Sequence, residues 1–173
     1  GIGARFRDAM ARFTTEIRAA LPAAFEDDRF RSRKESIEDE LKTRRDEALE
    51  AIEKAAKTKD VVVVRTPVGV GIAPAKKGEA IGAEEFEKLP TAEQERLKAA
   101  MHEVGELLEE MVRQVPKWER EARTRVHELE REVTRGAVGH LVEEIRGAFP
   151  GLPKIREHLD AVEADVVEHA AEI

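Results

Sequence analysis

Apolar residues recur every three or four positions over most of this chain, the spacing that places them on one face of an α-helix. The first such stripe runs from Phe6 to Leu21 and meets Pro22, which we expect to interrupt the helix. A second, narrow stripe runs from Ile37 to Ala55 on a heavily charged background. A stripe that narrow indicates a helix that touches one or two partners, not one buried on all sides.

The longest apolar stripe begins after Pro90 and predicts one long helix. In its first half the spacings alternate between four and three, which is the heptad pattern of a left-handed coiled coil. That seam consists of Leu97, Met101, Val104, Leu108, Met111, Val115, Trp118 and Ala122. From Val126 to Ala148 spacings of four predominate, so the stripe drifts round the helix. Pro116 lies inside the seam without the N–H that a helix needs there, which predicts a kink or a break.

Capping residues indicate where the helices begin. Asp27 or Ser32 can cap the second helix, and Ser32 with Glu35 matches a capping box. Thr91 with Gln94 matches a second capping box at the start of the long helix. A last helix follows the long one, and its expected buried side consists of Ile155, Leu159, Val162 and Val166.

One stretch, Asp60 to Gly82, departs from the helical pattern and predicts a small β-hairpin. It opens with four consecutive valines, which suit a strand because a β-branched side chain is stiff at χ1. The residues from Thr66 to Gly69 predict a turn, in which Pro67 presets φ and the glycine takes a positive φ. A second strand from Val70 to Pro74 and another turn from Lys76 to Glu79 complete the prediction.

These elements predict a mainly α fold, an elongated antiparallel coiled-coil helical hairpin with a small β-hairpin at its tip, on a helical base. The two long helices must run antiparallel because a short β-hairpin returns the chain toward its start. We expect a first base helix over residues 1–26, a coiled-coil arm over 27–134 with its tip at 60–82, and C-terminal base helices over 135–173. Gly136 and Gly139 indicate either close helix packing or a hinge between arm and base.

Composition narrows the classes of function. Charged residues make up 39% and aromatic residues 4%, which favours long, solvent-exposed helices. The net charge of −7, from 30 basic and 37 acidic residues, argues against a nucleic-acid partner. The chain has no cysteine, which fits the cytoplasm and leaves no thiolate metal site. No apolar run reaches membrane-spanning length, so no membrane partner is expected.

Motifs for catalysis and cofactor binding are missing from the sequence. Gly69-Val70-Gly71 lacks the Gly-Lys-Ser/Thr of a phosphate-binding loop, and no H-E-x-x-H occurs. Ser32 and Ser36 are the only serines, and both lie among arginine and glutamate at a helix start. We therefore expect no catalytic residue, no metal and no cofactor in this chain.

The apolar hairpin remains as the candidate contact surface. Successive valines point to opposite faces of a strand, and Gly71 leaves one face of the second strand nearly bare. One interpretation packs the larger side chains on neighbouring helices. The other leaves part of the edge open to capture an extended or unfolded chain. The candidate contact residues are Val62, Val64, Val68, Val70 and Ile72.

Four stretches of the chain resemble the helical insertion of the Lon-like AAA+ protease family. They are FRSRKESIEDE (Phe30 to Glu40), VRTPVGVGIAPAKKGEAIGAEEFEKLP (Val64 to Pro90), VPKWEREARTRVHELEREVTRGAVGHLVEEI (Val115 to Ile145) and LDAVEADVVEHAAE (Leu159 to Glu172). The hairpin sequence and the W-E-R-E…V-G-H-L pattern are more specific than the pattern of a generic Glu/Arg-rich coiled coil.

The resemblance implies that the chain is a segment of a longer serine-type endopeptidase. Such proteins join an ATPase-type module, degenerate in some members, to a C-terminal peptidase domain with a Ser-Lys dyad, and they assemble as hexamers. ATP and Mg²⁺ then belong to the parent, because no residue here matches the nucleotide-binding loops, the nucleophilic serine motif or its lysine. The insertion is implied to receive or gate unfolded protein substrates beside the parent's other domains. The alternative is a structural coiled-coil spacer or an adaptor that mediates protein–protein assembly.

Overall fold

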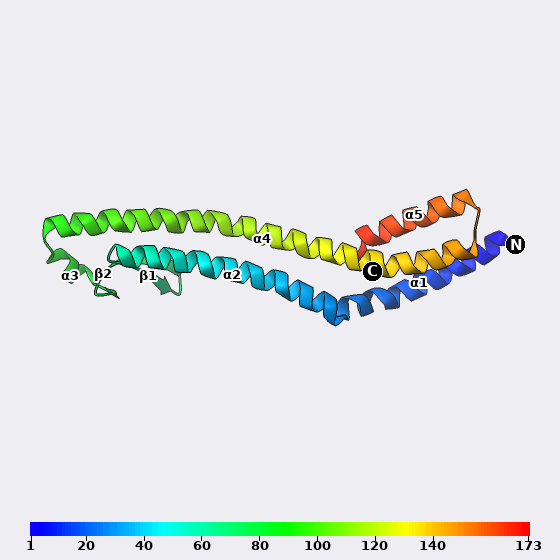
Figure 1. Cartoon of the computed structure of the whole chain (residues 1–173), viewed down its shortest axis with the longest axis horizontal. Helices are drawn as coiled ribbons and strands as arrows, with labels where there is room; N and C mark the ends of the chain where they lie inside the picture. Colours follow the sequence, from blue (N-terminus) through cyan, green and yellow to red (C-terminus); the bar gives the residue numbers. More distant parts are fainter. The chain divides into compact units, whose positions relative to one another are not determined.

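The computed structural model describes residues 1–173, apart from the side chain of Ala171. The fold is mainly helical with a small three-stranded antiparallel sheet, which confirms the predicted class at this level (Figure 1). The helices are α1 (Ile2–Glu26), α2 (Asp28–Thr58), α3 (Ala83–Glu87), α4 (Thr91–Ala148) and α5 (Pro153–Glu168), followed by the 3₁₀ turn η1 (Ala170–Glu172). The strands are β1 (Val61–Thr66), β2 (Gly69–Lys76) and β3 (Glu79–Ala80).

The chain divides into two compact units. Unit 1 comprises Gly1–Glu38 and Ala122–Ile173, and unit 2 comprises Asp39–Glu121. Both units contain part of α2 and part of α4. The predicted boundary between base and arm lay at residues 27 and 134. Unit 1 extends further along both helices, to Glu38 on α2 and from Ala122 on α4. The reason is an apolar cluster of Phe30, Ile37 and Leu129, which holds the first turns of α2 against α4.

The core of unit 1 forms where α1 and α5 both lie alongside the second half of α4 (Figure 1). The stripes predicted for α1 and α5 are buried or half-buried, as expected. On α4 the buried stripe is broader than the sequence predicted, because that helix has a neighbour on more than one side. Thr134, Val138 and Val142 are fully buried, whereas Ala148, which we expected inside, is exposed. The buried Thr134 hydroxyl donates a hydrogen bond of 2.7 Å to the Glu130 carbonyl.

The prolines do not end their helices, so the interruption predicted at Pro22 is wrong and α4 is not broken at Pro116. Helix α1 continues past Pro22 to Glu26, and α4 continues past Pro116 to Ala148. Each proline removes one N–H, so the carbonyl four residues earlier loses its partner. That carbonyl belongs to Arg18 or to Val112, and both residues are exposed, so water can reach it. The remaining hydrogen bonds and the buried neighbours on either side hold each helix together.

Helix α2 begins at Asp28 and is capped by Asp27. The Asp27 carboxylate accepts a hydrogen bond of 2.8 Å from the backbone N–H of Arg29. Of the two predicted caps, Asp27 is therefore correct, and Ser32 lies inside the helix as an ordinary exposed residue. Ser32 is displaced from the cap because the helix starts one turn earlier than its capping-box pattern indicated.

Helix α4 begins without the predicted capping box. Pro90 precedes it, and its carbonyl accepts the backbone N–H groups of Glu93 and Gln94, both at 3.0 Å. Thr91 is already the first helical residue, so its hydroxyl is not at the capping position. The Gln94 side-chain amide donates instead to the carbonyls of Glu87 and Leu89, at 3.1 and 2.9 Å. These bonds join the end of α3 to the start of α4.

Candidate protein-contact surface

The β1–β2 hairpin belongs to unit 2 and follows the turns that the sequence predicted. The strands pair from Val61↔Pro74 to Thr66↔Gly69, which leaves Pro67 and Val68 as a two-residue loop. Gly69 has a φ of 145°, and the Thr66 hydroxyl donates to its carbonyl at 2.9 Å. The turn between β2 and β3 is also a two-residue loop, formed by Lys77 and Gly78.

That second turn has positive φ at both of its central residues, Lys77 (52°) and Gly78 (83°). Two positive φ values in a two-residue loop are the geometry that matches the twist of an antiparallel pair. The turn predicted between Lys76 and Glu79 is therefore confirmed. It brings β3 against the end of β2, where the backbone N–H of Ile81 donates to the Pro74 carbonyl at 2.9 Å.

One face of the sheet packs against the helices of unit 2. Val61 is 2% exposed and joins a sheet–helix cluster with Ile52, Ala56, Ala100 and Val104. Val63 and Ile72 are half-buried against the same cluster. A Cβ at Gly105 would lie 3.7 Å from the Ile72 Cδ1 atom, an ordinary contact distance, so Ile72 of β2 packs beside this position of α4. The sheet thus lies along the side of α2 and α4, although we expected a tip that projects from their end.

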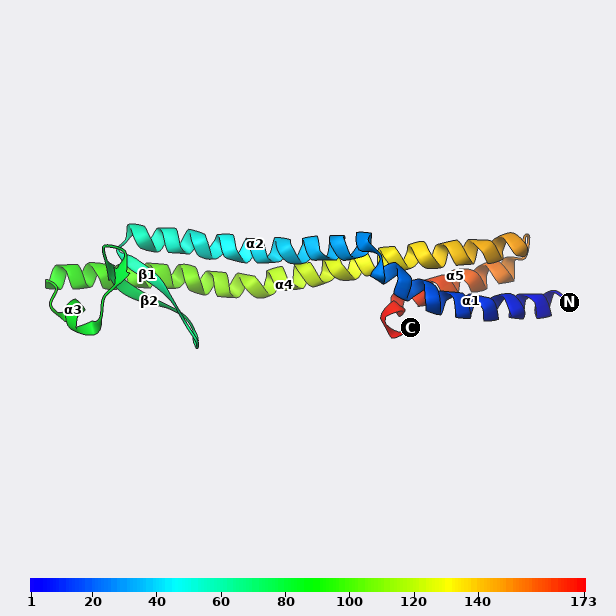
Figure 2. The ribbon, with the colours of Figure 1, turned by 90° about the horizontal axis from the view of Figure 1, so that it is seen from below.

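The turn end of the hairpin bends away from α4 (Figure 2). Val68, in the loop, is 98% exposed, and Val70, two residues before Ile72 on the same face, is 44% exposed. Val62 and Val64 point to the opposite face of β1 and are half-buried. The structure therefore brings Val68 and Val70 together as an exposed apolar end. Ile72, Val62 and Val64 lie at other places on the sheet.

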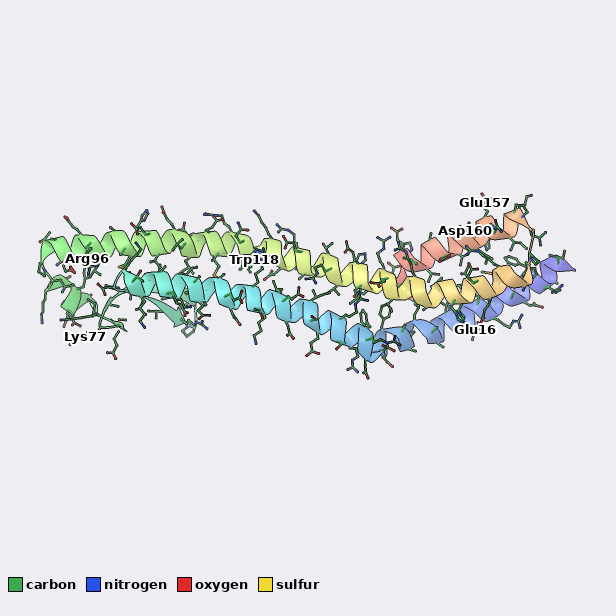
Figure 3. All side chains as sticks on the ribbon, viewed as in Figure 1. Glu16, Lys77, Arg96, Trp118, Glu157 and Asp160 are labelled. Carbon is green, nitrogen blue, oxygen red and sulfur yellow. The ribbon has the colours of Figure 1, made fainter. Side chains whose placement is uncertain are left out.

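Ion pairs fasten the sheet to the helices at both ends. Arg65 on β1 contacts Glu53 on α2 at 3.3 Å. Asp60, before β1, accepts a hydrogen bond of 3.1 Å from Arg96 on α4, which Figure 3 labels at the start of that helix. Hydrogen bonds to Glu93 and Asp60 raise the pKa of the Arg96 guanidinium. Exposed pairs of this kind add little stability each, so we assign them to positioning the sheet.

A third contact places a cation beside an aromatic ring in unit 2. The Arg44 guanidinium on α2 lies 4.5 Å from the centre of the Trp118 ring on α4, and Trp118 is labelled in Figure 3. Arg44 also contacts Glu121 at 3.0 Å, and Arg45 contacts Glu119 at 3.5 Å. These contacts join α2 to α4 at the boundary of the unit. They make the tryptophan a reporter of unit 2.

A groove of about 570 Å³ runs between α2 and the start of the sheet. Its walls are Glu53 and Lys57 on α2, residues 60–63 at and before β1, and Ala75, Lys77 and Gly78 around the second turn. The sequence did not reveal this groove, because it is lined by segments that meet only in the folded chain. The run of valines was its only local signal.

Two exposed apolar residues on α4 were also missed. Leu107 is 46% exposed and Val112 is 64% exposed. They flank the predicted seam without belonging to it, so a search for heptad positions passes over them. Their exposure becomes evident only when the structure shows which face of α4 contacts α2.

The predicted hinge glycines lie within the continuous part of α4 in unit 1. A Cβ at Gly136 would have no atom within 4 Å, whereas a Cβ at Gly139 would lie 3.7 Å from the Glu163 Oε1 atom of α5. Only Gly139 therefore approaches a neighbouring helix. The spacing of the two glycines did not indicate which of them this would be.

Two kinds of arrangement are absent among the described residues, a cluster of metal ligands and a membrane-crossing helix. No group of three or more histidine, aspartate or glutamate side chains among them could hold a metal ion. Within the same residues, no helix is both long and apolar enough to cross a bilayer. The histidines that contact carboxylates, such as His102 with Glu106 at 3.2 Å, have exposed side chains.

No family model matches this chain, and no curated protein matches it either. The likeness to the Lon-like insertion therefore stays an inference from the sequence stretches quoted above.

Proposed function

We propose that this chain is a non-catalytic, substrate-engaging domain of a Lon-like serine protease. In this proposal the parent carries the Ser-Lys peptidase and the ATPase-type module, assembles as a hexamer and works in the cytoplasm. The chain itself contributes contact with unfolded protein, either delivering it or gating its entry.

The observation that carries the proposal is the exposed apolar end of the hairpin. Val68 is 98% exposed and Val70 is 44% exposed, although the other large apolar side chains of the sheet are buried or half-buried. Unfolded proteins differ from folded ones in offering apolar side chains on extended backbone, and a projecting apolar loop can bind them. A loop held by a rigid helix pair can present these side chains without reordering on contact.

The proposal includes a coiled coil between α2 and α4. The heptad seam from Leu97 to Ala122 is buried or half-buried throughout unit 2 and its boundary, which supports this packing. Such a pair gives the sheet a rigid support.

A binding assay with a permanently unfolded protein tests the proposal. A reduced, carboxymethylated and fluorescently labelled protein is titrated with the chain, and its anisotropy is measured. The double variant Val68→Ser with Val70→Ser should bind at least tenfold more weakly, because burial of even one valine contributes about 1.5 kcal/mol. Both side chains face solvent, so the circular dichroism spectrum should not change.

Val112→Ser provides the matched control, since it removes an exposed valine from α4 in the same unit. That variant should bind like the unaltered chain. Equal affinities for the double variant and the unaltered chain would contradict the proposal.

The second candidate is a structural spacer or assembly adaptor, and the exposed Leu107 and Val112 on α4 favour it. Apolar residues that flank a helical seam can seat another helix. Under this function, Leu107→Glu with Val112→Glu should lower association with neighbouring domains or copies, as measured by sedimentation. The hairpin variant should then leave association unchanged.

A further inference from the structure

A second groove lies between α1 and the C-terminal part of α4. This α1–α4 groove has a volume of about 320 Å³ and lies wholly within unit 1. Its apolar floor consists of Ala9, Phe13, Leu141, Ile145, Ala148 and Phe149. Among the described residues no side chain of α5 lines it, and Ala148 stays exposed there. The groove can therefore receive side chains of a further helix laid along α1 and α4.

Four charged residues of α1 line this groove, and their signs alternate. In chain order they are Arg5, Asp8, Arg12 and Glu16, all with exposed side chains. Spacings of three and four residues place them on one face of the helix, on which Glu16 is labelled in Figure 3. None of the four has an ion pair with any residue that the structure describes. By contrast, at another helix contact of unit 1, Arg33 of α2 pairs with Glu132 of α4 at 3.0 Å.

The net charge of the α1–α4 groove does not select a partner. Glu144 of α4, which lies 3.5 Å from His140, is the fifth charged residue, so two basic and three acidic side chains line the groove. That balance favours neither a strongly acidic nor a strongly basic segment. The order of signs along α1 is the feature that can distinguish partners, because each charge must meet its opposite.

This order of signs is complementary to itself when it is reversed. From Arg5 to Glu16 the signs are basic, acidic, basic and acidic, and in the reverse direction every position has the opposite sign. In an antiparallel second copy, Arg5 faces the partner's Glu16 and Asp8 faces the partner's Arg12. The midpoints of these two pairs differ by about half a residue, or about 0.8 Å of helix rise, so one placement satisfies both. A parallel second copy would oppose like charges instead.

We propose that the α1–α4 groove binds a second copy of the chain, with the two α1 helices antiparallel across a two-fold axis. Each α1 then lies in the other copy's groove, as a self-complementary contact requires. Burial of the apolar floor supplies the affinity, since exposed ion pairs contribute little each, and the ion pairs fix direction and register. Ile2, which is 55% exposed in the single chain, lies opposite the partner's Ala19. This inference goes beyond the proposed function and uses no residue of unit 2.

Sedimentation equilibrium of the unaltered chain is the first test. We expect a monomer–dimer equilibrium that shifts toward monomer as salt is added, because the ion pairs are exposed to solvent. A chain that stays monomeric at low salt up to about 1 mM would overturn the inference, since the dissociation constant would then exceed that value.

Two charge-reversed variants test the order of signs. Arg5→Glu with Arg12→Glu makes the series wholly acidic, and Asp8→Arg with Glu16→Arg makes it wholly basic. Each variant alone should self-associate at least tenfold more weakly than the unaltered chain. An equimolar mixture of the two should form a one-to-one complex, because opposite charges then face each other along the whole series. Absence of that complex would overturn the inference.

Arg7→Glu with Arg18→Glu is the matched control for the acidic variant. It makes the same change of charge on the same helix, but on the opposite face and outside the groove. The control should dimerise like the unaltered chain. A loss equal to that of the acidic variant would show that only the overall charge matters, which would overturn the inference. Circular dichroism verifies that each variant is folded.

Single-cysteine variants test the direction, since the chain has no cysteine of its own. Oxidation of a mixture of Ile2→Cys and Ala19→Cys should give mainly the mixed disulfide dimer. In the antiparallel arrangement the two copies of either position lie about 25 Å apart along the helices, too far for a disulfide. Disulfides formed mainly between like positions would overturn the antiparallel arrangement.

The same variants separate this inference from the functions proposed above. If Leu107→Glu with Val112→Glu abolishes dimerisation and the charge-reversed variants of α1 do not, the contact lies on α4 in unit 2 and the inference fails. The acidic α1 variant should bind unfolded protein like the unaltered chain, because the hairpin is unchanged in it. Failure of either proposal therefore leaves the other standing.

Discussion

Truncation of Val104 tests most directly how the sheet is held on the helices of unit 2. This side chain is 0% exposed and belongs to the cluster that joins Ile52 and Ala56 of α2 to Val61 of β1. Val104→Ala removes two methyl groups, which contribute about 0.8 kcal/mol each to stability when buried. The cavity left behind adds to this loss, because the surrounding helices and sheet relax only in part. We expect a decrease of about 2–3 kcal/mol in the free energy of unfolding of unit 2.

Trp118 makes the measurement specific. It is the only tryptophan, the chain has no tyrosine, and the residue lies in unit 2. Urea unfolding followed by its fluorescence should show a midpoint lowered by about 1–3 M, for a slope of about 1–2 kcal/mol per molar. Val112→Ala is the matched control on the same helix, and its exposed side chain should cost less than about 0.5 kcal/mol.

Equal midpoints for Val104→Ala and Val112→Ala would refute the reasoning. That result would mean that the apolar face of the sheet is not packed on α2 and α4. The placement of the hairpin along the helices would then be wrong as well.

Three further predictions concern unit 1. Asp27→Ala should lower the free energy of unfolding by about 1 kcal/mol, whereas Ser32→Ala should leave it nearly unchanged, as measured by thermal unfolding. Gly136→Ala should raise it by about 0.5–1 kcal/mol, because a Cβ there meets no atom within 4 Å; lower stability would indicate an undetected contact. A hydrogen bond from Arg33 lowers the pKa of the Glu132 carboxylate in the folded chain. The pair therefore stabilises the fold fully at a pH above the carboxylate's unfolded-state pKa. This stabilisation is lost as the pH falls through the lower folded-state pKa. In Arg33→Ala the pKa of Glu132 should rise to its ordinary range, as measured by NMR titration of the carboxyl group. An unchanged titration curve would show that Arg33 does not cause the lowered pKa.

Local sequence determined whether each major segment forms a helix or a strand, and it determined the turns between the strands. A helical period needs only the spacing of apolar residues along one segment, so the stripe on α5 was predicted correctly. The turn at Pro67 was equally readable, because φ preferences belong to the residues themselves. The Asp27 cap was one of two local candidates, and the sequence alone did not separate them.

Tertiary contacts decided what local sequence did not. Thr134 is buried because α4 has neighbours on more than one side, and no stripe on a single helix contains that information. Val70 and Ile72 share one face of β2 and have similar side chains. Ile72 is half-buried where it packs beside Gly105 of α4, while Val70 is exposed where the hairpin bends away. The periodicity of a strand states which face a residue points to, but what lies opposite that face depends on segments distant in the sequence.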